Sequence, residues 1–267
     1  MTQQKHTVQQ VTALFFSPTH TTQKVVCALA QSLAQELGCP VKTVSWTLPQ
    51  ERTQVPSFGP QDVLVLGFPV YAGRIPALLD APLGSLTGNG AQVVPVAVYG
   101  NRDYDDALLE AYDLLEERGF QTVGAGAFIG EHSDTALVAH GRPSEEDLLL
   151  AREFGKKLAQ KVLEGQHLPA EALKGNRPYK ERRPGGHVEP KTTKDCTDCM
   201  FCANHCPVGA IDKENPRVIH DGCIRCCACV KGCPEHAKYF DDKVYAQIRG
   251  MLLTNCLAPK QPELFGI

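Results

Sequence analysis

Two short runs of cysteine constrain this chain more than any other feature. The first run has cysteines at 196, 199, 202 and 206, and the second repeats this spacing at 223, 226, 229 and 233. A proline follows the last cysteine of each run. Thiols three residues apart along a tight turn can face a common point, so each run offers three sulfurs to one metal group. The fourth sulfur must then come from outside that run.

Zinc and disulfides are the alternatives to an iron–sulfur interpretation. Zinc needs four ligands in tetrahedral array, usually as two Cys-x2-Cys pairs with a longer loop between them. A third Cys-x2 step and a Cys-x3-Cys-Pro ending exceed that need. Disulfide frameworks are typical of short secreted chains, and these cysteines are too close together and too regular for one. Cys27, Cys39, Cys227 and Cys256 fit no pattern and are interpreted as buried apolar residues.

The segment from Cys196 to Pro234 resembles bacterial ferredoxins with two [4Fe-4S] clusters, including the Cys-Pro-Val-Gly-Ala-Ile stretch at 206–211. The resemblance implies crossed ligation, in which the last cysteine of each run binds the cluster of the other run. The first cluster would then be held by Cys196, Cys199, Cys202 and Cys233, and the second by Cys206, Cys223, Cys226 and Cys229.

The length of 267 residues favours two unequal domains. From changes in composition we expect a first domain over 1–165, a Pro/Gly-rich linker over 166–190, a ferredoxin domain over 191–240 and a tail over 241–267. The tail has a helical pattern at 244–253, and packing back across both domains is its expected use. The basic run at 174–183 is interpreted as a solvated tether, with a docking patch as the alternative.

Location and charge narrow the range of partners. The first ten residues are polar and unlike a signal peptide, and no stretch approaches the ~18 apolar residues of a membrane span. We therefore expect a cytoplasmic protein without a membrane span. Residues 1–165 carry 12 Lys and Arg against 18 Asp and Glu, and each oxidised cluster with its thiolates would add about −2. Nucleic acid is not an expected partner, because it would need a basic face.

Apolar and amphipathic stretches alternate along the first 165 residues. Strands are expected at 11–16, 41–46, 62–68, 92–99 and 121–129. Helices are expected at 25–37, 75–86, 103–118 and 144–164, with Ser144 and Asp147 forming a capping box. The alternation predicts an α/β fold with a doubly wound, five-stranded parallel sheet of order 2-1-3-4-5. Its ligand site is expected at the carboxyl ends of strands 1 and 3.

The loop after the first strand reads Ser-Pro-Thr-His-Thr-Thr over 17–22. Hydroxyls and backbone N–H groups at a helix N-terminus can bind an anion without Lys or Arg, although a plain N-cap is the alternative. In this position the loop resembles the phosphate loop of the flavodoxin family, Thr-x-Thr-Gly-x-Thr, which wraps the phosphate of FMN. The hydroxyl positions fall on Ser17, Thr19, Thr21 and Thr22, and His20 stands where the family usually has glycine.

Two further loops resemble those that flank the flavin ring in the same family. In the loop after the third strand, Tyr71 is placed to stack on the ring, and Gly73 is placed to let the backbone turn toward the reduced flavin. In the loop after the fourth strand, Tyr104 is the candidate for the other ring face. Arg74 and Arg102 are candidate phosphate, ribitol or partner contacts, and His132 lies on the same edge. The full sets are Pro69, Val70, Tyr71, Ala72, Gly73 and Arg74, and Tyr99, Gly100, Asn101, Arg102 and Tyr104. Ordinary Gly/Pro turns are the alternative.

As a whole the chain resembles the flavodoxin-ferredoxin fusion proteins of anaerobic bacteria. The resemblance implies an electron-transfer protein that passes low-potential electrons between two [4Fe-4S] clusters and FMN within one chain. Redox proteins would be its donor and acceptor. One alternative is an FMN-dependent reductase of a small-molecule acceptor fed by its own clusters, and a further alternative is a redox or oxygen sensor.

Overall fold

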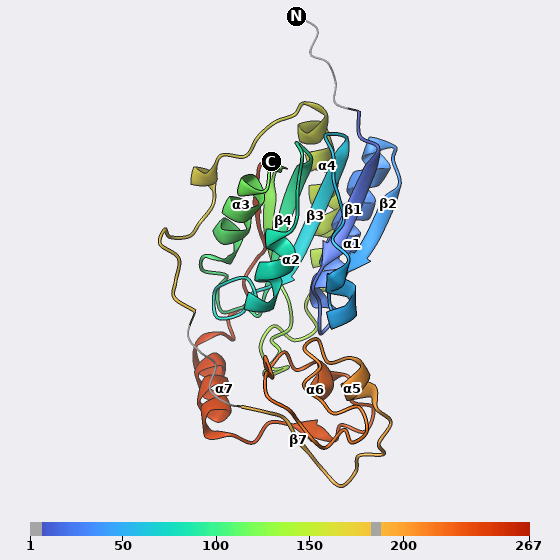
Figure 1. Cartoon of the computed structure of the whole chain (residues 1–267). Helices are drawn as coiled ribbons and strands as arrows, with labels where there is room; N and C mark the ends of the chain where they lie inside the picture. Colours follow the sequence, from blue (N-terminus) through green and yellow to red (C-terminus); the bar gives the residue numbers. More distant parts are fainter. Residues whose placement is uncertain (1–6, 183–187) are drawn as a thin grey trace, which may run out of the picture.

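A parallel sheet forms the centre of the N-terminal domain in the computed structural model, which describes residues 7–182 and 188–267 (Figure 1). The parallel strands are β1 (Gln10–Phe15), β2 (Val41–Ser45), β3 (Asp62–Pro69), β4 (Gln92–Tyr99), β5 (Gln121–Thr122) and β6 (Ala125–Ile129). Their order is β2-β1-β3-β4-β6, with β5 also paired to β4. The predicted doubly wound order is thus confirmed.

The expected fifth strand is split in two by a bulge. Gln92 of β4 pairs with Gln121, whereas Val96 of β4 pairs with Gly126, so the outer strand has one extra residue between these pairs. A bulge of this kind interrupts the hydrogen-bond ladder and bends the strand. The strand predicted over 121–129 therefore appears as β5 and β6.

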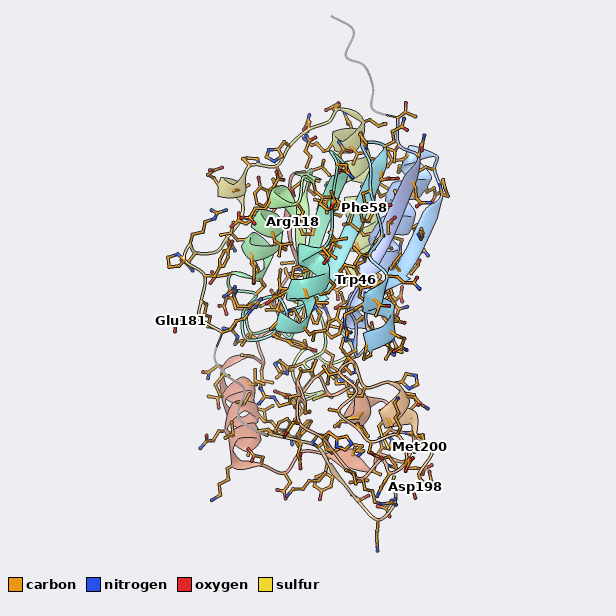
Figure 2. All side chains as sticks on the ribbon, in the orientation of Figure 1. Trp46, Phe58, Arg118, Glu181, Asp198 and Met200 are labelled. Atoms are coloured by element: carbon orange, nitrogen blue, oxygen red, sulfur yellow. The ribbon has the colours of Figure 1, made fainter. Side chains whose placement is uncertain are left out.

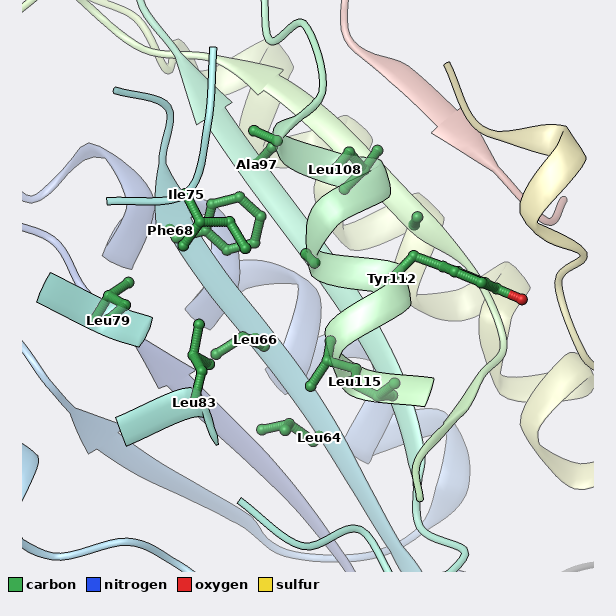
Figure 3. Close-up of a cluster of buried hydrophobic side chains, with 14 of the residues drawn as sticks. Leu64, Leu66, Phe68, Ile75, Leu79, Leu83, Ala97, Leu108, Tyr112 and Leu115 are labelled. Atoms are coloured by element: carbon green, nitrogen blue, oxygen red, sulfur yellow. The ribbon is translucent and has the colours of Figure 1, made fainter. Parts of the chain in front are cut away.

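Helices cover both faces of the sheet. α1 (Thr21–Leu37) and α4 (Glu145–Leu163) pack on one face, and α2 (Asp80–Gly84) and α3 (Ala107–Glu117) pack on the other. Side chains of β3 alternate between them, with Val63 and Val65 toward α1 and α4. Leu64, Leu66 and Phe68 point into the core below α2 and α3 (Figure 3). This alternation is the period of two that a buried strand requires.

Two predicted helices differ at their N-terminal ends. The helix expected at 75–86 is a 3-10 turn, η2 (Ala77–Leu79), followed by α2. The helix expected from 103 begins at Ala107, because Asp103 Oδ1 accepts a hydrogen bond from Asp105 N and holds a turn there instead. The capping box of α4 is confirmed, since Ser144 Oγ accepts from Asp147 N and Asp147 Oδ2 accepts from Ser144 N.

The second domain, residues 191–240 and called the lobe below, lies beyond the carboxyl ends of the parallel strands (Figure 1). It contains a two-stranded antiparallel ribbon, β7 (Lys191–Thr192) and β8 (Lys238–Tyr239), and two short helices, α5 (Phe201–Asn204) and α6 (Ala228–Lys231). Its apolar core of buried residues consists of Cys202, Ala203, Ile211 and Cys229. So small a core makes the lobe depend on additional stabilisation.

The tail returns to the first domain. After α7 (Lys243–Asn255), strand β9 (Glu263–Phe265) pairs antiparallel with β6 and extends the sheet beyond its five predicted positions. Asn101 fixes this return, because its buried amide group donates to the carbonyls of Cys256 and Ala258 and accepts from Lys260 N. None of the helices in the described residues is both long and apolar enough to cross a membrane.

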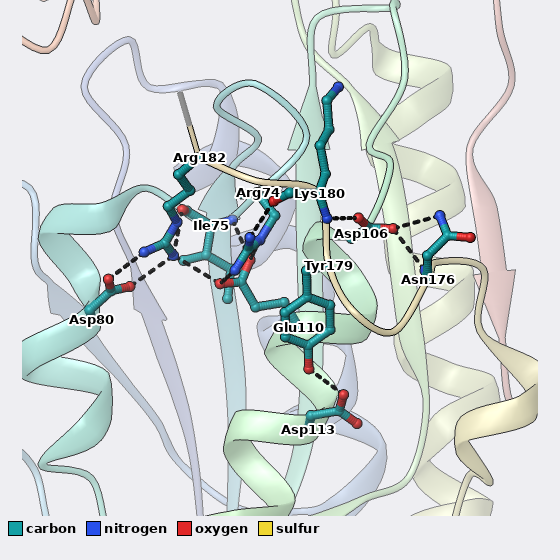
Figure 4. Close-up of polar contacts among 10 residues, drawn as sticks. All are labelled: Arg74, Ile75, Asp80, Asp106, Glu110, Asp113, Asn176, Tyr179, Lys180 and Arg182. Atoms are coloured by element: carbon teal, nitrogen blue, oxygen red, sulfur yellow. Dashed lines mark hydrogen bonds and ion pairs between the residues drawn. The ribbon is translucent and has the colours of Figure 1, made fainter. Parts of the chain in front are cut away.

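The basic run in the linker is exposed to solvent, as its composition predicts, but it is held against the first domain and is not a free tether. After η3 (Ala170–Ala172) the chain runs along α3, where acidic side chains hold it (Figure 4). Arg182 pairs with Asp80 and Glu110, and Tyr179 donates to Asp113. The two residues of each pair are separated by up to about a hundred positions in the sequence, so only the fold brings them together. Residue 183, at the end of the predicted run, lies outside the described residues.

Candidate functional site

The two cysteine runs fold as copies of one another. The residue after the second cysteine, Met200 in one run and Cys227 in the other, has φ of 62° and 61° and precedes α5 or α6. Asp198 and Arg225, one residue before that cysteine, also have positive φ. Each such non-glycine residue costs about 1–3 kcal/mol, and strain of this kind concentrates at functional sites. The duplicated sequence therefore produces a duplicated and strained backbone.

Each of two cavities in the lobe is lined by cysteines of both runs. The first contains Cys196, Cys199, Cys202 and Cys233. The second contains Cys206, Cys223, Cys226 and Cys229. Crossed ligation requires this grouping, in which the fourth sulfur comes from the other run. The role of these eight residues as ligands stays a prediction.

The cysteines surround a volume and not a point. Over 7–182 and 188–267, no three His, Cys, Asp or Glu side chains converge as the ligands of a single metal ion would. In a [4Fe-4S] cluster each thiolate binds a different iron, so its four sulfurs stand around the cluster. Each cavity has the donor type that such a group needs, from four cysteines of the two runs.

Burial and local charges set the state of the thiols. Burial raises the pKa of Cys226 to about 12, and it raises the pKa of Cys202 above its ordinary value although the ammonium group of Lys238 opposes this. Bound iron would be needed to hold such thiols as thiolates. Ala210 N donates to Cys206 Sγ at 3.3 Å and Ala237 N to Cys233 Sγ at 3.2 Å. Hydrogen bonds to sulfur tune the potential of a cluster.

The predicted phosphate loop forms a tight turn into α1. His20 has φ of 64°, the left-handed conformation that glycine adopts readily, so its place in the loop preserves the backbone path. Ser17 is buried and its Oγ accepts from Gln23 N at 3.0 Å. Thr22 Oγ1 is buried without a hydrogen-bond partner among the described residues. Thr19 and Thr21 are partly exposed beside it.

The two ring-side loops lie against each other at the same edge. Val70 N donates to Val98 O at 3.0 Å, and Asp106 N donates to Gly73 O at 3.1 Å. Ala72 and Asn101 both have positive φ, at 52° and 61°. Tyr71 is partly buried, and its ring meets Phe16 edge-on with 6.4 Å between centroids. The fold thus brings the three predicted loops together, with Tyr71 next to the start of the phosphate loop.

Several predicted ring-side residues make contacts within the protein instead. Arg74 pairs with Glu110 of α3, and Arg102 pairs with Asp105 of its own loop. Tyr104 is 2% exposed and its hydroxyl donates to Glu263 of β9 at 3.0 Å. Asn101 holds the tail, as described above, and Tyr99 packs its buried ring against Tyr104. A role for Tyr104 at a cofactor ring stays a prediction, and β9 gives its hydroxyl a partner that the sequence pattern did not reveal.

Comparisons with known proteins found matches to parts of the chain. Residues 191–212 match the 4Fe-4S binding domain family. The chain unites a flavodoxin-like domain with a ferredoxin-type 4Fe-4S domain. In this fusion, the flavodoxin-like assignment rests on the strand order described above. The 4Fe-4S assignment rests on the family match.

Individual relatives of the fusion resemble parts of it. The indolepyruvate oxidoreductase subunit IorA of Archaeoglobus fulgidus is 41% identical over 58 residues, which are 21% of this chain and 9% of that protein. The fusion therefore matches about a tenth of the length of this relative. A flavodoxin from the domain Archaea covers 58% of the chain and 99% of its own, with 13% identity and a TM-score of 0.42. A flavodoxin of Streptococcus pneumonia covers 57% and 99%, with 18% identity and a TM-score of 0.40.

The fusion has a contact surface between its two parts that the sequence did not reveal. Arg52, in η1 (Pro49–Thr53), donates to Pro207 O at 2.6 Å, and Lys231 pairs with Glu131 at 2.7 Å. Asp134, which is 9% exposed, lies 3.6 Å from Cys227 Sγ through its Oδ1. No motif marks these residues, because their partners come from distant segments.

Proposed function

We propose that this fusion is an electron-transfer protein that passes low-potential electrons between two [4Fe-4S] clusters and FMN. The observation that carries the proposal is the position of the lobe, which lies at the carboxyl edge where the three predicted flavin loops meet (Figure 1). Tyr71 of these loops and Ile224 of the lobe pack against the same core, and burial raises the pKa of the Tyr71 phenol. Flavin and cluster sites would therefore share one interface.

The residues of the phosphate loop fit the phosphate of FMN. A buried hydroxyl without a partner is rare because it costs about 1–3 kcal/mol, and Thr22 Oγ1 is such a group in the predicted loop. His20 keeps the required turn, and the start of α1 contributes backbone N–H groups and the positive end of the helix dipole. Ser17, Thr19 and Thr21 add hydroxyls. On the ring side, Tyr71 is the residue best placed to contact a flavin.

The pairing of groups explains the chemistry. FMN, when bound, accepts one or two electrons, whereas each cluster passes one at a time. The protein positions the sites, excludes water through the contact between its two parts, and sets cluster potentials through the bonds to Cys206 and Cys233. Residues 1–165 are acidic, which would disfavour the anionic reduced flavin and lower its potential. A low-potential carrier suits anaerobic metabolism.

The placement of the lobe also favours a carrier over a reductase. A reductase of a small molecule needs open space above the flavin ring. Here the ring-side loops are held by α3 through Arg74 and by the tail through Asn101, and Ile224 of the lobe packs against the same core as Tyr71. These contacts place protein around the ring-side loops, and this arrangement would limit the access of a small-molecule acceptor to a flavin bound there.

The first test is to measure iron, acid-labile sulfide and flavin in protein purified without oxygen. We expect about eight iron and eight sulfide per FMN. A redox titration followed by EPR and visible absorbance should then show both clusters and the flavin titrating. Four iron per chain would contradict the second cluster, and full iron without flavin after incubation with FMN would contradict the flavin site.

A further inference from the structure

The two cysteine cavities differ in their contact with the N-terminal domain. In the cavity of Cys223 and Cys226, the intervening Ile224 packs against the core of the N-terminal domain. Arg225 Nε lies 3.8 Å from Asp134 Oδ1, and the buried Cys227 Sγ lies 3.6 Å from the same oxygen. Three residues between or beside the ligands of this cavity therefore touch the domain that carries the predicted flavin loops.

The equivalent positions of the first run are occupied by Thr197, Asp198 and Met200. The first two are exposed, and Met200 packs against the core of the lobe itself. Asp198 pairs with Arg217 inside the lobe, and Figure 2 shows Asp198 and Met200 at one lateral edge of the lobe. Cys199 is exposed, whereas its counterpart Cys226 is buried.

The two cysteine runs differ in the residues next to their ligands. Both runs keep the same spacing and the same positive-φ backbone, so their capacity to hold a metal group is the same. They differ most at two positions, where the second run has the apolar Ile224 and the buried Cys227 and the first run has the exposed Thr197 and the partly buried Met200. Burial against the N-terminal domain accounts for this difference, because apolar side chains such as Ile224 and Cys227 stabilise a structure only where they are removed from water.

We propose that the two cluster sites act in a fixed order, an inference that rests on the function proposed above. The site of Cys206, Cys223, Cys226 and Cys229 is the inner one, which exchanges electrons with FMN. The site of Cys196, Cys199, Cys202 and Cys233 is the outer one, which exchanges electrons with a one-electron carrier protein. Each reduced cluster gives up one electron, so two electrons pass in succession from the carrier through the outer and inner sites. With one proton from solvent, they convert oxidised FMN to its reduced anion.

The order can be tested on the unaltered protein by iron removal. The reconstituted chain is treated anaerobically with an iron chelator, and the freed thiols are alkylated with iodoacetamide and mapped by mass spectrometry. We expect release of about half of the iron first, with labelling of Cys196, Cys199, Cys202 and Cys233. Earlier labelling of the set that contains Cys226, or simultaneous labelling of both sets, would overturn the order.

A matched pair of variants tests the path itself. Cys199→Ala and Cys226→Ala remove equivalent ligands, and rapid photoreduction with a small reductant separates cluster reduction from flavin reduction. We expect Cys226→Ala to lose the fast transfer of electrons from cluster to FMN and Cys199→Ala to retain it. Loss in Cys199→Ala with retention in Cys226→Ala would overturn the order. If electrons do not pass from cluster to FMN in the unaltered protein with full iron and FMN, the proposed function is wrong. The order of alkylation would still test separately which cluster site is the outer one.

Discussion

Thr22 is the residue whose environment most directly distinguishes a binding role from a structural one. Its Oγ1 is one of two buried side-chain polar atoms without a partner in the described residues, and the other is Oγ1 of Thr122 in β5. We expect Thr22→Val to stabilise the flavin-free protein by about 1 kcal/mol, because an unsatisfied hydroxyl is removed. FMN affinity should fall about tenfold or more, since a hydrogen bond to a charged group contributes roughly 1.5–3 kcal/mol.

Thr122→Val is the matched control for this prediction. It removes the same kind of group far from the loop, so it should stabilise the protein similarly and leave FMN affinity unchanged. Thermal unfolding of the flavin-free protein and fluorescence titration with FMN measure the two effects. Equal FMN affinity in the Thr22→Val variant and the unaltered protein would contradict a phosphate contact.

His20 tests the backbone of the same loop. His20 has φ of 64°, and this left-handed backbone conformation costs a residue with a Cβ about 1–2 kcal/mol more free energy than it costs glycine. We therefore expect His20→Gly to be about 1 kcal/mol more stable than His20→Ala, with FMN binding retained. Both variants lose the contact between His20 Nδ1 and Gln23 Oε1, so the comparison isolates the backbone. A more stable alanine variant would show that the loop does not keep this conformation in solution.

At the scale of elements, the packing of α1 against α4 depends on one glycine. A Cβ on Gly155 would lie 2.6 Å from Leu29 O, so Gly155→Ala should destabilise the domain by roughly 1–3 kcal/mol despite the higher helix propensity of alanine. Gly250 lies within α7 with nothing near its Cβ position, and Gly250→Ala should instead stabilise by up to about 1 kcal/mol. Thermal unfolding midpoints measure both, and a neutral or stabilising Gly155→Ala would contradict the close helix contact.

At the scale of the whole molecule, the two parts should differ in their dependence on iron. The lobe buries a small apolar cluster, whereas both faces of the main sheet are packed with large side chains. We expect complete removal of iron to unfold 191–240 and to leave the N-terminal sheet folded, because metal binding supplies the folding free energy of such small domains. Hydrogen exchange followed by mass spectrometry should show lost protection over 191–240 with little change over β1, β3 and β4. Retained protection over 191–240 would contradict this dependence.

The features of this protein that follow local rules could be predicted from the sequence. Spacing identified the duplicated cysteine runs, and the alternation of apolar and amphipathic stretches predicted the order of the parallel strands. The Ser144 and Asp147 box and the position of the loop at 17–22 also follow from neighbours in the chain. Hydrogen bonds between near neighbours and the burial of repeating apolar side chains leave a signature in composition and spacing.

The tertiary structure alone decided which distant groups meet. Only the fold assigned Tyr104 to Glu263, gave Asn101 the tail to hold, and placed the basic linker against α3. Only the fold also showed that Cys226 of the second run is buried, whereas its counterpart Cys199 in the first run is exposed. The physical reason is that the strength of an ion pair or hydrogen bond depends on distance and burial. For residues 72 or more positions apart, packing sets these quantities and sequence spacing does not.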